Sequence, residues 1–251
     1  MVGDSFAFGW GVEEHQRVSE QLQGFIRRDV YNISAPSDIL GYRKLLEYAE
    51  VNGAEIRNVV VLFNMSNDIG DYDISPEYPP QAKEIDHVPF MVRFFRLKKF
   101  LAANSALYHL LTNLTNQNEV LQFIALKTGL MIPLTAVPKR SINDHVIKST
   151  VNHLKLITKK YEAIVVLIPS RGIWIGKNKN FERTNHTKFL KYMKKSGIRF
   201  IDMSIIQELG GNPMRYHFKS DGHWNPSGHK LVAKALASQM SFKTTNAKQN
   251  K

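Results

Sequence analysis

The sequence contains no cysteine, which excludes disulfide bonds, thiol nucleophiles and cysteine-based metal sites but leaves the cellular compartment undetermined. It has no run of about 18 uncharged apolar residues, so no membrane-spanning helix is predicted. Its first residues also lack the pattern of a signal peptide. The nine histidines show neither His-Glu-x-x-His nor another paired-ligand spacing, so no metal and no other cofactor is predicted.

The composition is that of an ordinary globular protein, and 251 residues suit one α/β domain with an insertion. The charge is unevenly distributed. Residues 1–90 contain 7 Lys and Arg against 15 Asp and Glu, whereas residues 91–251 contain 27 against 7. The basic part suggests anionic partners such as acidic glycans or anionic lipids, although a lysine-rich solvated surface is the simpler explanation. Nucleic acid is not predicted as a partner, because no helix-turn-helix, zinc or RNA-recognition pattern accompanies the charge.

Short apolar runs alternate with amphipathic segments along the chain. After a first strand that ends at Gly3, the runs predict strands at residues 29–33, 59–63, 163–168 and 198–202. The amphipathic segments predict helices at residues 12–28, 39–50, 142–160, 181–195 and 228–240. This alternation predicts a three-layer α/β/α sandwich around a parallel sheet. We expect a single domain over residues 1–240 and a disordered tail over residues 241–251.

Residues 87–130 interrupt the alternation and are predicted to form a helical insertion after the third strand. The segment 88–103 combines phenylalanines with arginines and lysines. Such a helix could lie on an anionic membrane surface, or it could pack over a site with its cationic side chains reaching water. We favour the packing helix, because amphipathic packing helices are common.

Polar side chains follow three of the predicted strands. Ser5 follows the first, where it is either a nucleophile beside the free N–H groups of a helix or simply the cap of that helix. Asn67 follows the third strand and carries an amide that can donate to an oxyanion. Asp221 and His223 follow the last. Because parallel strands end at one edge of a sheet, these side chains are predicted to meet, and together they supply what acyl transfer needs.

Four segments, in order, resemble the blocks of the SGNH (GDSL-like) hydrolase family: Gly3-Asp4-Ser5, Asn32–Ser37, Asn67-Asp68 and Asp221–His229. The resemblance implies a flavodoxin-like sheet of about five strands in the order 2-1-3-4-5. It also implies that Ser5 attacks an ester carbonyl, with His223 as general base and Asp221 orienting the imidazole. The implied oxyanion hole uses the N–H groups of Ser5 and Ser34 and the amide of Asn67. No Gly-x-Ser-x-Gly is present, which argues against an α/β-hydrolase nucleophile elbow.

The sequence departs from the family pattern at three points. Ser34 stands where a glycine is usual, but it still offers a backbone N–H. Met65 also replaces a glycine and would crowd or line the pocket. The last block reads Asp-x-His-Trp instead of Asp-x-x-His, which resembles a subgroup acting on acetyl groups of bacterial exopolysaccharides. Met65, Arg171 and Trp224 are the predicted substrate-binding residues, although Arg171 could equally be an ordinary surface arginine.

Two other histidines and Asp4 lie near the same motifs. His229 is predicted to pack or cap at the start of the last helix, and His217 has no carboxylate near it in the sequence. Asp4 is expected to hydrogen-bond nearby backbone N–H groups and so shape the turn at Ser5. His223 is therefore the predicted base.

The predicted function is hydrolysis of a small acyl ester, above all an O-acetyl ester of a carbohydrate, by a cofactor-free Ser5–His223–Asp221 triad. Two alternatives remain: an O-acyltransferase with the same triad, and an inactive module that binds an acidic glycan or a membrane surface. The sequence leaves the oligomeric state open. Because only Met1 and Val2 precede Gly3, whereas a strand normally has about five residues, we expect the natural protein to extend upstream.

Overall fold

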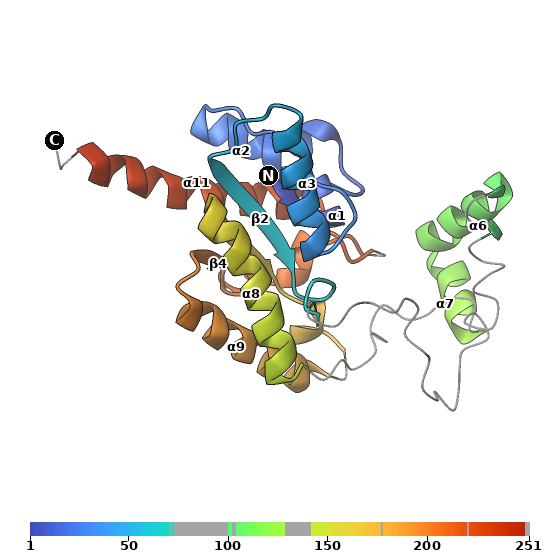
Figure 1. Cartoon of the computed structure of the whole chain (residues 1–251). Helices are drawn as coiled ribbons and strands as arrows, with labels where there is room; N and C mark the ends of the chain where they lie inside the picture. The colour runs from blue at the N-terminus through green and yellow to red at the C-terminus, as the bar shows by residue number, and fades with distance from the viewer. Residues whose placement is uncertain are drawn as a thin grey trace. The chain divides into compact units, whose positions relative to one another are not determined.

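The computed structural model describes residues 1–70, 72, 100–101, 104–128, 142–176, 178–219 and 221–248 (Figure 1). The chain divides into two compact units. The first comprises Met1–Ser75, Ser141–Phe218 and Gly222–Lys251, and the second comprises Pro76–Arg140 and Lys219–Asp221.

The first unit is built on a parallel four-stranded sheet in the order β1-β2-β3-β4. The strands are β1 (Val2–Gly3), β2 (Asn58–Asn64), β3 (Glu162–Ile168) and β4 (Phe200–Asp202). β2 and β3 pair over their whole length, from Asn58 opposite Glu162 to Asn64 opposite Ile168. The two apolar runs that were predicted to be buried on both faces therefore form the centre of the sheet.

The number of strands differs from the prediction, because the described residues form four strands and not five. The predicted second strand is irregular, yet it lies beside β1. The amino group of Met1 donates to the carbonyl of Tyr31 at 2.6 Å, and the N–H of Ile33 donates to the carbonyl of Met1 at 3.0 Å. β1 is too short to continue this ladder. The segment thus takes its predicted place at the edge of the sheet without strand pairing.

β1 pairs only with Val61 and Leu62, so the amino half of β2 extends beyond it. A mainly apolar cavity of about 750 Å³ lies at this level, and its lining includes Leu22, Val59 and Ile164. It lies at the amino ends of β2 and β3. The polar residues singled out by the sequence follow the opposite, carboxyl ends.

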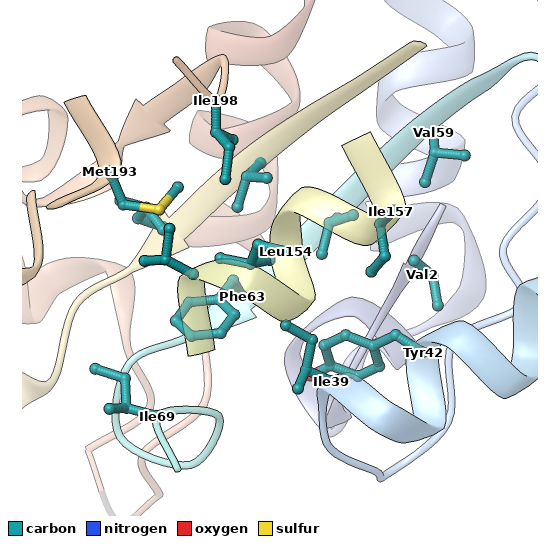
Figure 2. Close-up of a cluster of buried hydrophobic side chains, with 14 of the residues drawn as sticks. Val2, Ile39, Tyr42, Val59, Phe63, Ile69, Leu154, Ile157, Met193 and Ile198 are labelled. Carbon is teal, nitrogen blue, oxygen red and sulfur yellow. The ribbon is translucent and has the colours of Figure 1, made fainter. Parts of the chain in front are cut away.

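Helices cover both faces of the sheet and complete the predicted α/β/α sandwich (Figure 1). One face carries α3 (Ile39–Val51), α8 (Asp144–Lys160) and α9 (Lys179–Ser196), and the other carries α2 (Val18–Ile26) and α11 (Pro226–Lys248). Side chains alternate along β2, so that Val61 and Phe63 pack against the first group of helices while Val60 and Leu62 pack against the second. Figure 2 shows the first cluster, with Phe63 from β2 near Leu154 from α8.

The observed helices follow the predicted ones with shifted ends. α2 is preceded by a separate 3-10 turn, η1 (Glu14–Gln16), within the predicted helix 12–28. α11 continues to Lys248, where a disordered tail from residue 241 was predicted. The reason is that residues 241–248 contain neither glycine nor proline to end the helix. The sequence reading passed over three short elements: η2 (Arg171–Ile173), α10 (Met203–Leu209) and η3 (Pro213–Tyr216).

The second unit contains α6 (Ala106–Gln117) and α7 (Glu119–Lys127), within the region predicted to be a helical insertion. The hydroxyl of Ser105 caps α6 by accepting from the N–H of Tyr108. Most of the predicted basic, aromatic helix at 88–103 lies outside the described residues. Among the described helices, none is long and apolar enough to cross a membrane.

Candidate active site

The turn after β1 places Ser5 at the carboxyl edge of the sheet. The carboxylate of Asp4 caps the short helix α1 (Ser5–Phe8) by accepting from the N–H of Phe6 at 2.9 Å. The residue before Asp4 must be a glycine, because a Cβ at Gly3 would lie 2.7 Å from both the carbonyl oxygen of Leu62 and the Cβ of Ala7. Ser5 is the first residue of α1, so its N–H has no acceptor within the helix. The side chain of Ser5 is partly exposed.

Ser5 meets His223 across almost the whole length of the chain. Ser5 Oγ lies 2.7 Å from His223 Nε2, a hydrogen-bonding distance. The His223 ring is also held by a tilted contact with Phe6, with ring centroids 4.9 Å apart. Nε2 is thus the ring nitrogen that faces the serine, and Nδ1 is the other hydrogen-bonding atom of the ring. A serine paired with a histidine as general base would have this arrangement, and the base role of His223 stays a prediction.

Asp4 links the turn at Ser5 to the loop after β2. Its Oδ2 accepts from Asn64 Nδ2 at 2.9 Å and from Asn67 Nδ2 at 3.4 Å. Burial raises the pKa of Asp4, and hydrogen bonds from Asn64, Phe6 and Asn67 partly offset that rise. Asn67 is itself exposed, so its amide can donate one hydrogen to Asp4 and present the other to a ligand.

A second buried carboxylate supports the same loop from below. Asp68 Oδ2 accepts from the hydroxyl of Tyr42 at 2.7 Å and from the N–H of Asn64 at 2.8 Å. Burial raises the pKa of Asp68 well above its usual range, and the nearby charge of Asp4 adds to the rise. The two carboxylates thus hold Asn64 from its side chain and from its backbone, which fixes the loop that carries Asn67.

Arg171 lies at the end of β3, beside the loop that carries His223. A Cβ added to Gly222 would lie 3.0 Å from Arg171 Nη2, so the guanidinium packs directly on that backbone. Asp221 precedes His223 by two residues and belongs to the second compact unit. Its role in orienting the imidazole remains a prediction.

The C-terminal part of the chain, residues 165–251, matches the family model described as "SGNH hydrolase-like domain, acetyltransferase AlgX". The segment includes Arg171, Asp221 and His223. Over these residues the chain is similar to the SGNH hydrolase-like domain. No curated protein matches the sequence at a significant level.

Two solved structures resemble this chain, and the first of them supports the fold. A member of the lipolytic protein G-D-S-L family from Veillonella parvula DSM 2008 superposes with a TM-score of 0.51 at 14% identity, covering 96% of each chain. A second structure, from Desulfitobacterium hafniense DCB-2 and attributed to the same family, gives a TM-score of 0.47 at 13% identity over 94% of this chain and 95% of that one. The sequence blocks predicted an SGNH-type α/β fold, and the family match and the first of these structures confirm it.

Three residues predicted from the SGNH pattern take other positions in this structure. The N–H of Ser34 donates to Asn32 Oδ1 at 3.1 Å, so a bond within the chain already uses that predicted oxyanion donor. Met65 is almost fully buried, and its sulfur lies 3.1 Å from His186 Nδ1. Trp224 is completely buried. Both side chains are buried in this structure, and their predicted role in substrate binding stays a prediction.

The other two histidines near this SGNH motif are buried. Burial lowers the pKa of His217 and of His229 to about 4 each, so both rings are neutral at pH 7. His217 Nδ1 lies 3.2 Å from the carbonyl of Pro213, and the His229 ring packs edge-on against Trp224. These contacts suit packing. His223 is the histidine that meets Ser5.

The sequence predicted no role for Trp10, which lies near His223 in the structure. This residue is exposed, and its ring centroid lies 6.2 Å from that of His223. The signal in the sequence was its place between Gly9 and Gly11, directly after the SGNH serine block. In the part of the chain that the structure describes, no group of three or more histidines and carboxylates could hold a metal ion.

Proposed function

We propose that this protein cleaves a small acyl ester, in the first place an O-acetyl ester on a carbohydrate, through a covalent acyl intermediate on Ser5. The observation that carries the proposal is the 2.7 Å distance from Ser5 Oγ to His223 Nε2 at the carboxyl edge of the sheet. The SGNH-like family match over residues 165–251 supports it independently, because that segment contains His223 but not Ser5.

In the proposed reaction, His223 Nε2 accepts the proton of Ser5 as Oγ attacks the ester carbonyl. Negative charge then develops on the carbonyl oxygen, where the exposed amide of Asn67 and the N–H of Ser5 are the proposed donors. Asp4 orients the Asn67 amide through the 3.4 Å contact. The protonated imidazole next gives its proton to the leaving alcohol. Asp221 is proposed to orient the ring from the other side.

The second step decides between two candidate functions. If water attacks the acyl-serine, the protein is an esterase. If a sugar hydroxyl attacks, it is an O-acetyltransferase, a candidate favoured by the word acetyltransferase in the description of the matching family model. The same serine and base serve both reactions.

The test is turnover of p-nitrophenyl acetate by the purified protein, measured with and without a sugar acceptor. Release of p-nitrophenol and acetate at equal rates supports the esterase. Faster p-nitrophenol release together with an acetylated sugar, detected by mass spectrometry, supports the transferase. A fluorophosphonate probe should label Ser5, as located by peptide mass spectrometry. Absence of both turnover and labelling would contradict the proposal and favour an inactive binding module.

A further inference from the structure

A large aromatic side chain stands in water next to the proposed base. Trp10 is 52% exposed, and its ring lies 6.2 Å from the His223 ring at an angle of 37°. The other two tryptophans are used differently. Trp224 is fully buried, and Trp174 donates its indole N–H to Glu208 at 2.8 Å. The exposed indole face beside the proposed base is open to contact with a ligand.

The backbone holds Trp10 in a defined place relative to the nucleophile. The N–H of Trp10 donates to the carbonyl of Ser5 at 3.0 Å. Gly9 and Gly11 on either side have φ of 88° and 80°, a left-handed conformation that other residues rarely adopt. The loop is also packed, because a Cβ at Gly11 would lie 3.0 Å from the Phe218 ring. The indole is therefore attached to a built turn and not to a free loop.

An aromatic ring and two cations lie close in the chain to Trp10 or against the residues next to Trp10 and His223. Phe8 is 40% exposed, and the guanidinium of Arg17 lies over its ring at 5.4 Å from the centroid. Arg171 packs on the backbone next to His223. A sugar ring suits such a surface, because its C–H groups can lie on the electron-rich indole face while its hydroxyls bond to polar neighbours.

We propose that Trp10 is the platform on which the sugar ring of the substrate stacks while its acetyl ester is held at Ser5. The inference rests on the proposed function and specifies the substrate for it. An acetyl group contains only two carbon atoms, so the sugar ring that bears it must lie close to Ser5. Trp10 is also close to Ser5, because its backbone N–H is hydrogen-bonded to the Ser5 carbonyl. A sugar ring stacked on the indole of Trp10 would thus place its acetyl ester within reach of Ser5 and His223.

The experiment compares Trp10→Ala with Trp10→Phe, which keeps an aromatic face, and with Tyr48→Ala as the matched control. Tyr48 is 69% exposed on α3 and has no place in the proposed site. Two substrates are used: an O-acetylated methyl glucopyranoside, and ethyl acetate, which has no ring. We expect Trp10→Ala to lower the ratio of kcat/KM for the sugar ester to that for ethyl acetate by about five- to tenfold, the loss of one ring contact. Trp10→Phe should restore most of the ratio, and Tyr48→Ala should keep it.

A binding measurement separates this inference from the proposed function. The probe is the acetamido analogue of the same glucoside, whose amide resists turnover, titrated by calorimetry. Weaker binding by Trp10→Ala, with turnover absent in the unmodified protein, would support the platform and overturn the proposed function. Ester turnover with equal analogue affinity in Trp10→Ala and the unmodified protein would overturn the platform alone. An equal loss of kcat/KM on both substrates would also overturn it, because Trp10 would then act by positioning His223.

Discussion

The described residues bring a serine and a histidine together in two places, which differ in geometry and in exposure. The first is Ser5 and His223 with the predicted partner Asp221. In the second, His186 of α9 meets Asp202 at the end of β4 and Ser204 at the start of α10.

The difference lies in which ring nitrogen each partner meets. In the buried cluster, Asp202 Oδ2 and Ser204 Oγ both approach His186 Nε2, at 3.2 and 3.1 Å. The other nitrogen faces the sulfur of Met65 at 3.1 Å. A proton relay needs the hydroxyl on one nitrogen and the carboxylate on the other. In the open pair, Ser5 Oγ meets Nε2 of His223, and the predicted orienting group, Asp221, would have to meet Nδ1.

Solvent access separates the two clusters further. Burial raises the pKa of Asp202, but the hydrogen bond and charge of His186 outweigh it, so that the pKa is lowered overall. The carboxylate of Asp202 thus holds α9 against the start of α10 through its contacts with His186 and Ser204. Ser5 and His223 are both partly exposed at the carboxyl edge of the sheet, where a substrate can reach them. The same three residue types can therefore form a buried structural cluster or an accessible pair, depending on the geometry of the contacts and on exposure to solvent.

The largest expected effect that distinguishes the two clusters is the loss of ester turnover in variants of Ser5 and His223. We expect Ser5→Ala and His223→Ala each to lower kcat for p-nitrophenyl acetate by at least about 10³-fold, because the two residues act as a unit. The double variant should be little worse than either single one.

Ser204→Ala is the matched control, since it removes the corresponding hydroxyl from the buried cluster. It should retain kcat per folded molecule, as checked by circular dichroism and active-site titration. If Ser204→Ala lost turnover while Ser5→Ala kept it, the assignment of the two clusters would have to be exchanged.

A smaller loss is expected for Asn67, which has no counterpart in the buried cluster. Asn67→Ala should lower kcat by about 10²–10³ with little change in KM, because the amide acts on charge that develops in the transition state. Ser66→Ala changes the exposed neighbour on the same loop and should leave kcat as it is. Steady-state kinetics with unchanged kcat in Asn67→Ala would remove Asn67 from the proposed oxyanion hole.

The sequence was sufficient for the features that depend on local pattern and strand polarity. Continuous apolar runs predicted β2 and β3, and the common carboxyl edge of parallel strands predicted that Ser5 and His223 would meet. It was insufficient where the outcome depends on a partner. Residues 29–33 have strand-like residues, but β1 offers them too few pairing groups. Met65 was placed by its position in a family block, whereas packing against His186 decides where it lies.

Exposure was the other quantity that the sequence could not supply. Trp10 and Trp224 are the same residue type in glycine- or proline-containing polar segments, and the prediction chose Trp224 for the site. In the folded chain Trp224 packs edge-on against Phe6, while Trp10 remains in water. The Asp202–His186–Ser204 cluster was also missed, since a helix and a strand end come together there only in the folded chain.

Changes in the buried Asp202–His186–Ser204 cluster are expected to lower the free energy of unfolding. Asp202→Ala removes both the partner of His186 and the cap of α10, where Asp202 Oδ1 accepts from the N–H of Ser204 at 3.0 Å. We expect the free energy of unfolding in urea to fall by about 3 kcal/mol, the order of cost for removing one member of a buried pair. Glu47→Ala breaks the Arg43–Glu47 pair at the surface of α3 and should cost less than about 1 kcal/mol. Equal costs for the two variants would contradict a structural role for the buried cluster.

The smallest expected effect concerns how buried imidazoles respond to pH. Burial lowers the pKa of His229 from 6.5 to about 4. As the pH falls below 6.5, the unfolded chain gains a proton at this ring while the folded chain stays neutral until about pH 4. This ring should therefore lower the free energy of unfolding by about 2 kcal/mol between pH 7.5 and pH 5.

His229→Leu tests this, because it keeps an apolar group beside Trp224 and removes the titrating ring. We expect the variant to lose less stability than the unmodified protein when urea unfolding is measured at pH 7.5 and at pH 5. Part of the pH dependence should persist, because burial lowers the pKa of His217 in the same direction. His15→Leu, at an exposed position on η1, is the matched control and should leave the difference between the two pH values as it was. The same pH dependence in His229→Leu as in the unmodified protein would show that this ring is not held neutral in the core, and it would reopen the choice between His229 and His223 as the base.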